Sequence, residues 1–418
     1  MNTDTDIDFL VREAVFGTDG NKKAARQCIL GCAEEAHIFP ASIYKIYKAR
    51  GREEIPTDFT VPALNLRGMT YDIARTLFQT AKKLKVGVFI FELARSEMKY
   101  TNQTPNEFAA VILAAAVKES WNGPVFIQGD HFQTKLKKPG EPAEGEISAI
   151  ESLIEEAIGA GFYNIDIDTS TLVDLEKNTE VQRQKPNFEN CAYLTNFIRS
   201  IELPNITTSV GGEIGHIGGK NSTVEDFEAF MRGFEPLEKN PELGLSKISV
   251  QTGTSHGGMV LPNGSLAEVN IDFSILKSIS KACRQRYQMA GCVQHGASTL
   301  PDDLFYKFPE TETAEIHLST GIQNLIFDHE AFPKDLLTDI YTWLEKEKLS
   351  EMENGWTKEQ FRYKLRKKAW GKFKKEIWSI NESTKQQIGG TLAEKFAGWF
   401  KELNVTNTLD LVNKFVLN

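Results

Sequence analysis

Short runs of β-branched and other apolar residues alternate with stretches of helical periodicity along most of the chain. Eight such runs predict strands, at residues 59–66, 86–93, 124–129, 163–168, 207–213, 247–252, 291–294 and 314–318. The stretches between them, such as 70–85 and 146–161, repeat apolar residues every three or four positions, which predicts amphipathic helices. Eight strands that alternate with helices over about 250 residues are typical of a (β/α)8 barrel.

The competing fold is an open, doubly wound parallel sheet. That fold usually carries a glycine-rich dinucleotide turn directly after its first strand. Here Leu66 is followed only by Arg67 and Gly68, so the turn is missing. We therefore predict an α/β chain built on a TIM barrel.

Helical extensions are expected on both sides of the barrel. We place an N-terminal helical extension at residues 1–55, with two helices and a turn near 17–20, the barrel at 56–332, and a C-terminal helical arm at 333–418. The arm contains a basic run, and five apolar residues recur every fourth position through it: Phe361, Leu365, Ala369, Phe373 and Ile377. This spacing predicts one amphipathic helix that packs on the barrel or at a subunit interface with solvated charges. The alternative interpretation is that the basic run contributes to phosphate or anion binding.

Composition narrows the function classes. The chain has 418 residues and a formal net charge of −9, which argues against nucleic-acid binding as its main task. The longest apolar run, residues 108–117, is about half of what a membrane span requires. The acidic start lacks the order of a secretory signal, and the five scattered cysteines suggest reduced thiols. We expect a soluble, cytoplasmic protein without membrane or nucleic-acid partners.

Polar side chains follow the ends of the predicted strands, where a barrel carries its active site. His131, His256 and His295 come just after three different strands, so we expect them on the same rim. Three neutral imidazoles suit a catalytic Zn²⁺ with an open position, although another divalent metal is possible. The other four histidines, including His317, are interpreted as structural or incidental.

Acidic residues and candidate phosphate-binding residues also follow the predicted strands. Asp130 is placed to exchange protons with an oxygen near the metal, or else only to orient a histidine. Asp168 and Glu213 either bind a second metal position or close a hydrogen-bond network. The loops that hold Gly257, Gly296 and Ser298, and the hydroxyls of Ser319 and Thr320, are candidates for phosphate binding.

Six motifs in register resemble the class II, metal-dependent ketose-bisphosphate aldolases, which cleave fructose- and tagatose-bisphosphate. These motifs are VPALNL (61–66), GDHF (129–132), IDTS (167–170), GGEIGHIGG (211–219), GTSHGG (253–258) and QHGAS (294–298). The resemblance covers roughly residues 56–330 and implies a glycolysis-type aldolase of carbohydrate metabolism that forms homodimers or higher homo-oligomers. It makes His131, His256 and His295 zinc ligands, Asp168 and Glu213 a secondary metal position, and Asn65 a substrate contact. Asp130 then transfers the proton at the C4 hydroxyl.

The family also uses a loop glutamate that moves the C3 proton of the triose phosphate. Glu225 is the candidate for this base, although Gly218-Gly219 is followed by an apparent four-residue insertion before it. A capping carboxylate in the first turn of a helix is its other interpretation. The phosphate-binding serine after strand two is replaced by Ala94, and the strand-eight motif is altered, so we expect a divergent substrate.

The resemblance implies reversible cleavage of a phosphorylated ketose to a triose phosphate and an aldehyde, through a metal-stabilised ene-diolate. Two alternatives stay open: a metal-dependent sugar-phosphate isomerase or epimerase, and a non-catalytic aldolase-like accessory subunit. A Schiff-base aldolase would need a buried lysine at the active rim. Lys247 opens its strand at the opposite end, so we reject that mechanism.

Overall fold

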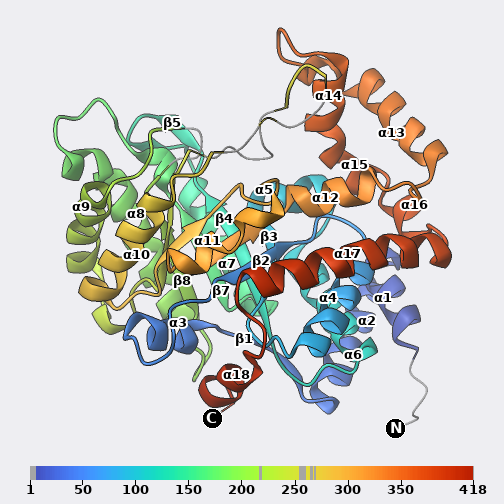
Figure 1. Cartoon of the computed structure of the whole chain (residues 1–418), viewed down its shortest axis with the longest axis horizontal. Helices are drawn as coiled ribbons and strands as arrows, with labels where there is room; N and C mark the ends of the chain where they lie inside the picture. The colour runs from blue at the N-terminus through green and yellow to red at the C-terminus, as the bar shows by residue number, and fades with distance from the viewer. Residues whose placement is uncertain (1–5, 216–218, 254–259, 264–266, 268–269, 418) are drawn as a thin grey trace.

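Eight parallel strands close into a barrel, as the alternating pattern predicts. The computed structural model describes residues 6–417, except 216–218, 254–259, 264–266 and 268–269. Around the barrel the strands follow the order β4, β3, β2, β11, β10, β9, β8, β7 and return to β4 (Figure 1). They are β2 (Val61–Asn65), β3 (Ile90–Ala94), β4 (Gly123–Gln133), β7 (Asn164–Asp168), β8 (Ser209–Glu213), β9 (Lys247–Val250), β10 (Cys292–Gln294) and β11 (Glu315–Leu318).

Helices surround this barrel and bury their apolar faces against it. They are α4 (Thr70–Leu84), α5 (Arg95–Thr101), α6 (Pro105–Lys118), α7 (Glu146–Gly159), α8 (Glu180–Ile201), α9 (Val224–Phe234), α10 (Phe273–Tyr287), α11 (Lys307–Glu310) and α12 (Thr320–Phe327). In α4, Ile73, Leu77 and Phe78 share one buried face, the helical spacing on which its prediction rests. A small hairpin of β5 (Leu136–Lys138) and β6 (Glu141–Pro142) lies between β4 and α7.

The N-terminal extension differs from the two helices expected. It contains α1 (Ile7–Phe16), α2 (Asp19–Glu35) and α3 (Tyr44–Gly51), and also the strand β1 (Ile38–Ala41). β1 pairs in parallel with the first residues of β4, from Gly123 on, whereas β7 pairs with β4 only from Gln128 on. The start of β4 therefore has a free edge, and β1 satisfies its backbone hydrogen bonds.

The C-terminal arm is helical, but its basic run is not one continuous helix. The arm comprises α13 (Lys334–Glu347), α14 (Lys358–Leu365), α15 (Ala369–Lys372), α16 (Lys374–Trp378), α17 (Glu382–Glu402) and α18 (Leu409–Phe415). A 3₁₀ turn at Arg366–Lys368 separates α14 from α15, where the buried Arg366 guanidinium binds the Asp328 carboxylate. The tighter turn brings this charged side chain inward, which the periodicity of the apolar residues could not reveal.

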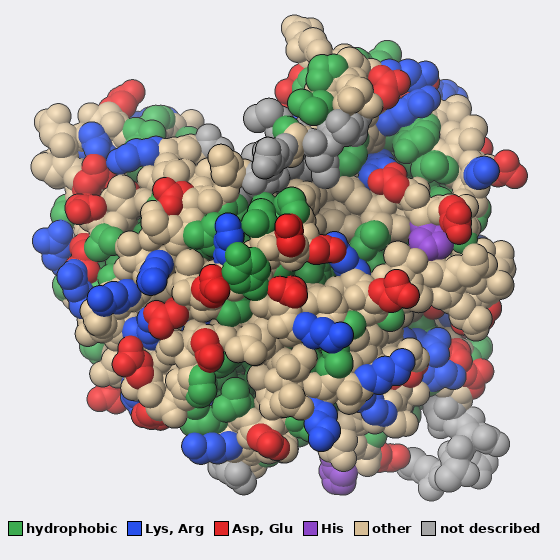
Figure 2. All heavy atoms as spheres, in the orientation of Figure 1, with side chains coloured by type: hydrophobic (Ala, Val, Ile, Leu, Met, Phe, Trp, Pro, Cys, Tyr) green, Lys and Arg blue, Asp and Glu red, His purple; other side chains and the backbone are tan. Residues whose placement is uncertain are grey.

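Surface charge is mixed on the face drawn in Figure 2. Acidic and basic side chains are interspersed over the barrel, and Lys and Arg side chains gather at the upper right, over the arm. Among the described residues, no helix combines the length and the apolarity needed to cross a bilayer.

Candidate active site

An irregularity in β4 turns two neighbouring polar residues into the barrel. In a regular strand, Asp130 and His131 would point to opposite faces. Here the pairing with β7 shifts register between Gly129 and Phe132, and His131 adopts a φ of 41°. Such a bulge redirects side chains locally. A Cβ at Gly129 would lie 2.5 Å from the Phe132 ring, so this position of the bulge requires glycine.

His131 lies among three of the predicted site residues. Its Nδ1 is 3.1 Å from Asp168 Oδ2 and 3.2 Å from Glu213 Oε2. The His295 ring stacks on it with centroids 4.2 Å apart. Asp168 is fixed in turn by hydrogen bonds from the Ser170 backbone N–H and hydroxyl. The ends of β4, β7, β8 and β10 thus bring together the four described members of the predicted metal set.

Burial and neighbouring charges both shift the pKa values of His131 and Glu213. Burial alone would lower the pKa of His131, but the Asp130 and Glu213 charges and the hydrogen bonds to Asp168 and Glu213 raise it well above its usual range. Burial and the Asp168 charge raise the pKa of Glu213 to about 8. Carboxylates and imidazoles packed this closely compete for protons, and a cation among them would replace those protons.

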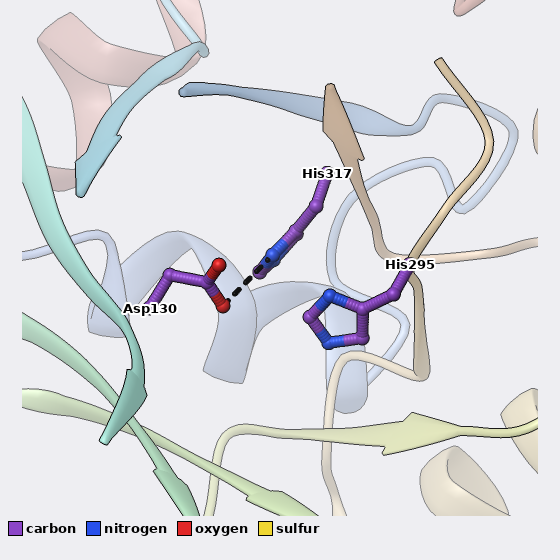
Figure 3. Close-up of side chains that lie close together, drawn as sticks. All are labelled: Asp130, His295 and His317. Atoms are coloured by element: carbon purple, nitrogen blue, oxygen red, sulfur yellow. Dashed lines mark ion pairs between the residues drawn. The ribbon is translucent and has the colours of Figure 1, made fainter. Parts of the chain in front are cut away.

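His317, set aside in the sequence analysis, lies at the centre of the site. Its Nδ1 is 3.2 Å from Asp130 Oδ1, and its ring meets the His295 ring edge-on at a centroid distance of 4.2 Å (Figure 3). Its Nε2 is 2.6 Å from Glu315 Oε1. Residues two apart on a strand share a face, so Glu315 and His317 both point inward from β11. That alternation in EIHL was the signal that could have identified His317.

A buried lysine lies beneath these groups. Lys247 Nζ donates to Gln128 Oε1 at 2.7 Å, to Asp166 Oδ2 at 3.0 Å and to Glu315 Oε1 at 2.5 Å. Burial alone would lower the pKa of Lys247, but the Asp166 and Glu315 charges raise it above its usual value. An amine that is protonated and fully paired is not a nucleophile. The geometry agrees with rejecting a Schiff-base mechanism.

The predicted substrate contacts at β2 and β11 form one network around Arg67. Asn65 donates to Glu97 Oε2 at 2.5 Å, and Glu97 also accepts from Arg67 Nε at 2.7 Å. Arg67 Nη2 donates to the Ser319 hydroxyl at 3.1 Å, and Nη1 lies 3.4 Å from the Thr320 hydroxyl. A guanidinium thus accompanies the two hydroxyls predicted to bind phosphate, which the sequence analysis did not anticipate.

The remaining predicted residues are placed as follows. Ser298 is buried and its hydroxyl accepts from the Gly321 N–H at 3.0 Å, which links the loop after β10 to the first turn of α12. Gly296 adopts a φ of 72°, which favours glycine. Glu225 is exposed in the first turn of α9, a helix that Thr223 caps together with Asp226. His256 and Gly257 lie outside the described residues.

The described residues fit a divalent metal. His131, Glu213 and His295 each offer a ligand atom, and these atoms lie within 4.8 Å of one another. Asp130, His295 and His317 form a second such group that shares His295. Two imidazoles with one carboxylate are a donor set that Zn²⁺ and similar metals accept. The chemistry of the site is therefore that of a metal-assisted reaction with carboxylates available for proton transfer.

The fold of this chain is similar to that of many solved structures, including the following two. Fructose-bisphosphate aldolase from Campylobacter jejuni has a TM-score of 0.51 and 15% identity, and the match covers 88% of this chain and 97% of that one. A Sinorhizobium meliloti protein described as a "probable tagatose 6 phosphate kinase" has a TM-score of 0.55 and 16% identity, over 85% of this chain and 98% of that one. No curated protein matches the sequence significantly.

A protein-family model gives the decisive match. The model for "Fructose-bisphosphate aldolase class-II" matches residues 55–376, which is more than half of the chain and includes every described residue of the site. Metal dependence is general to class II aldolases, so the match supports an aldolase-type, metal-dependent function. The chain belongs to the class II fructose-bisphosphate aldolase family.

Proposed function

We propose that this protein is a zinc-dependent aldolase that reversibly cleaves a phosphorylated ketose into a triose phosphate and an aldehyde. The observation that carries the proposal is the cluster of His131, Glu213 and His295 at the carboxyl ends of the strands, directly beside Asp130. His256 completes the proposed ligand set, and Asp168 and Glu213 supply the secondary position. When bound, the metal provides Lewis-acid stabilisation of negative charge on the substrate oxygens.

The residues of the chain divide the remaining work. Asp130 takes the proton from the C4 hydroxyl during cleavage and returns it during condensation. His317 faces the Asp130 carboxylate and is itself held by Glu315, which supports a fixed orientation for the proton carrier. Glu225 is the proposed base for the C3 proton. Glu225 is exposed at the start of α9.

Substrate phosphate is proposed to bind at the loops after β9, β10 and β11. Gly257, Gly296, Ser298, Ser319 and Thr320 form this proposed subsite, and Asn65 contacts the sugar. The positive guanidinium beside Ser319 and Thr320 supports an anionic substrate here. A homodimer or higher homo-oligomer and a cytoplasmic location stay predictions of the sequence.

Metal analysis and product analysis test the proposal together. Wild type, His131→Ala and the control His329→Ala, a histidine outside the site, are assayed for bound metal and for triose-phosphate release from a panel of ketose phosphates. We expect about one zinc per chain, lost only in His131→Ala, and triose phosphate from one substrate. Metal with conversion of substrate but no triose phosphate would favour the isomerase or epimerase. Chains without metal would overturn the catalytic reading and favour an accessory subunit.

A further inference from the structure

A cavity lies away from the barrel rim, between the two terminal extensions. It measures about 360 Å³, within the size range of small-molecule sites, and opens between the junction of α1 and α2 on one side and α15 and α16 on the other. Phe16 at the end of α1 packs edge-on against Trp378 at the end of α16, with ring centroids 5.4 Å apart, so the two extensions are in direct contact here (Figure 1). The end of the arm's basic run, Lys372, Lys374 and Lys375, lines this cavity.

The lining of this cavity is strongly basic for a chain with a net charge of −9. Its charged members are Lys22, Lys372, Lys374, Lys375, Glu107 and Glu376. The Lys374 ammonium is occupied by the Glu107 carboxylate and by the Asn102 carbonyl. In the described part of the chain, no ion pair joins Lys22, Lys372 or Lys375 to a carboxylate. Three lysines thus line the cavity without a carboxylate partner among the described residues.

The surroundings of the Lys374–Glu107 ion pair in the cavity wall carry more positive than negative charge. Burial lowers the pKa of Lys374, and the nearby charges of Lys22 and Arg26 lower it further, against the opposite effect of Glu107. Arg26 also approaches Glu107, with Nη2 3.6 Å from Oε2. The single carboxylate of Glu107 therefore serves two cations, Lys374 and Arg26. An anion in the cavity would be attracted by this excess of positive charge.

We propose that this cavity binds a small phosphorylated anion through Lys22, Lys372 and Lys375. A single phosphate would leave most of 360 Å³ unfilled, so the volume suits a phosphorylated metabolite with more than one anionic group. Lysine side chains are flexible, so their ammonium groups can gather around phosphate oxygens as point charges. Because Lys22 comes from α2 and the other two from the arm, the bound anion joins the N-terminal extension to the C-terminal arm.

Inorganic pyrophosphate is the probe, titrated calorimetrically into the full chain at low ionic strength. The test variant Lys372→Glu/Lys375→Glu is matched by Lys346→Glu/Lys401→Glu, which makes the same charge change at two exposed lysines outside the cavity. We expect the test variant to weaken pyrophosphate binding by about tenfold or more, and the control by about twofold or less. Pyrophosphate should also raise the melting temperature of wild type and of the control, but not of the test variant.

Circular dichroism without ligand verifies that both double variants are folded. Equal weakening in the two variants would mean that only net charge matters, and the proposal would fail. Failure of wild type to bind pyrophosphate would also overturn it. If binding survives in the test variant and falls in Ser319→Ala, the anion belongs to the barrel rim instead.

Discussion

A large stability effect is expected at Arg50, at the end of the barrel opposite the active site. This α3 side chain is fully buried and donates to five backbone carbonyls, those of Thr57, Phe59, Ala290, Glu312 and Thr313, at 2.6–3.3 Å. The guanidinium carbon also lies 4.7 Å from the Phe59 ring centroid. These carbonyls precede β2, β10 and β11, so one side chain joins three strand entries at the end of the barrel opposite the site.

Replacing Arg50 with methionine keeps much of the volume but leaves the carbonyls without their donor. Each buried polar group without a partner costs about 1–3 kcal/mol, but relief of the buried cation offsets part of the sum. We therefore expect a net loss of about 3–5 kcal/mol in the free energy of unfolding. Arg50→Lys, with one donor group instead of three, should lie between wild type and Arg50→Met.

Urea unfolding followed by circular dichroism measures this loss. The control is Arg52→Met. Arg52 is the exposed residue directly after α3, and its Nε donates a hydrogen bond to Gln288 Oε1. The expected loss in the free energy of unfolding for this variant is below about 0.5 kcal/mol. A loss below about 1 kcal/mol in Arg50→Met, with an unchanged m-value, would refute the reasoning. It would mean that the carbonyls find other partners once the guanidinium is gone.

Three further changes test other parts of the fold. Lys247→Met should cost about 3–5 kcal/mol in urea unfolding, because two buried carboxylates lose their cation; near-neutral stability would contradict the pairing. Gly129→Ala should cost about 1–3 kcal/mol, since the new Cβ would lie 2.5 Å from the Phe132 ring, whereas Gly390→Ala, with nothing within 4 Å of its Cβ, serves as the control. Burial raises the pKa of Glu238 to about 8. A carboxyl group with a raised folded pKa loses stability as pH rises from about 4.5 to 8, so Glu238→Gln should flatten the pH dependence of melting temperature over that window; equal slopes would reject the shift.

The barrel and much of its rim could be predicted because both follow from local pattern. In a (β/α)8 chain, apolar residues repeat with a different period in strands and in helices. Each strand is followed by a loop that is rich in glycine, serine and charged residues. Asp130 and His131 could be placed at the rim on this basis alone. The bulge that turns both inward depends on how β4 pairs with β7, and pairing partners are not written in the local pattern.

The broken helix of the arm has a similar explanation. Apolar residues at every fourth position predict which side is buried, and Phe361, Leu365, Ala369 and Ile377 are indeed buried. The same spacing does not report that Arg366 is drawn inward to Asp328, because that partner lies far away along the chain. Periodicity thus gave the buried face but not the continuity of the backbone.

The sequence by itself therefore determined the class of fold, the order of its strands and the chemical types gathered at one end of the barrel. Only the tertiary structure decided that His317 faces Asp130, that Lys247 is saturated by buried carboxylates, and that lysines from both extensions meet around one cavity. The physical reason is the same in each case. Local pattern reports which face of an element is apolar, whereas electrostatic partners and cavities arise from contacts between segments that are distant in sequence.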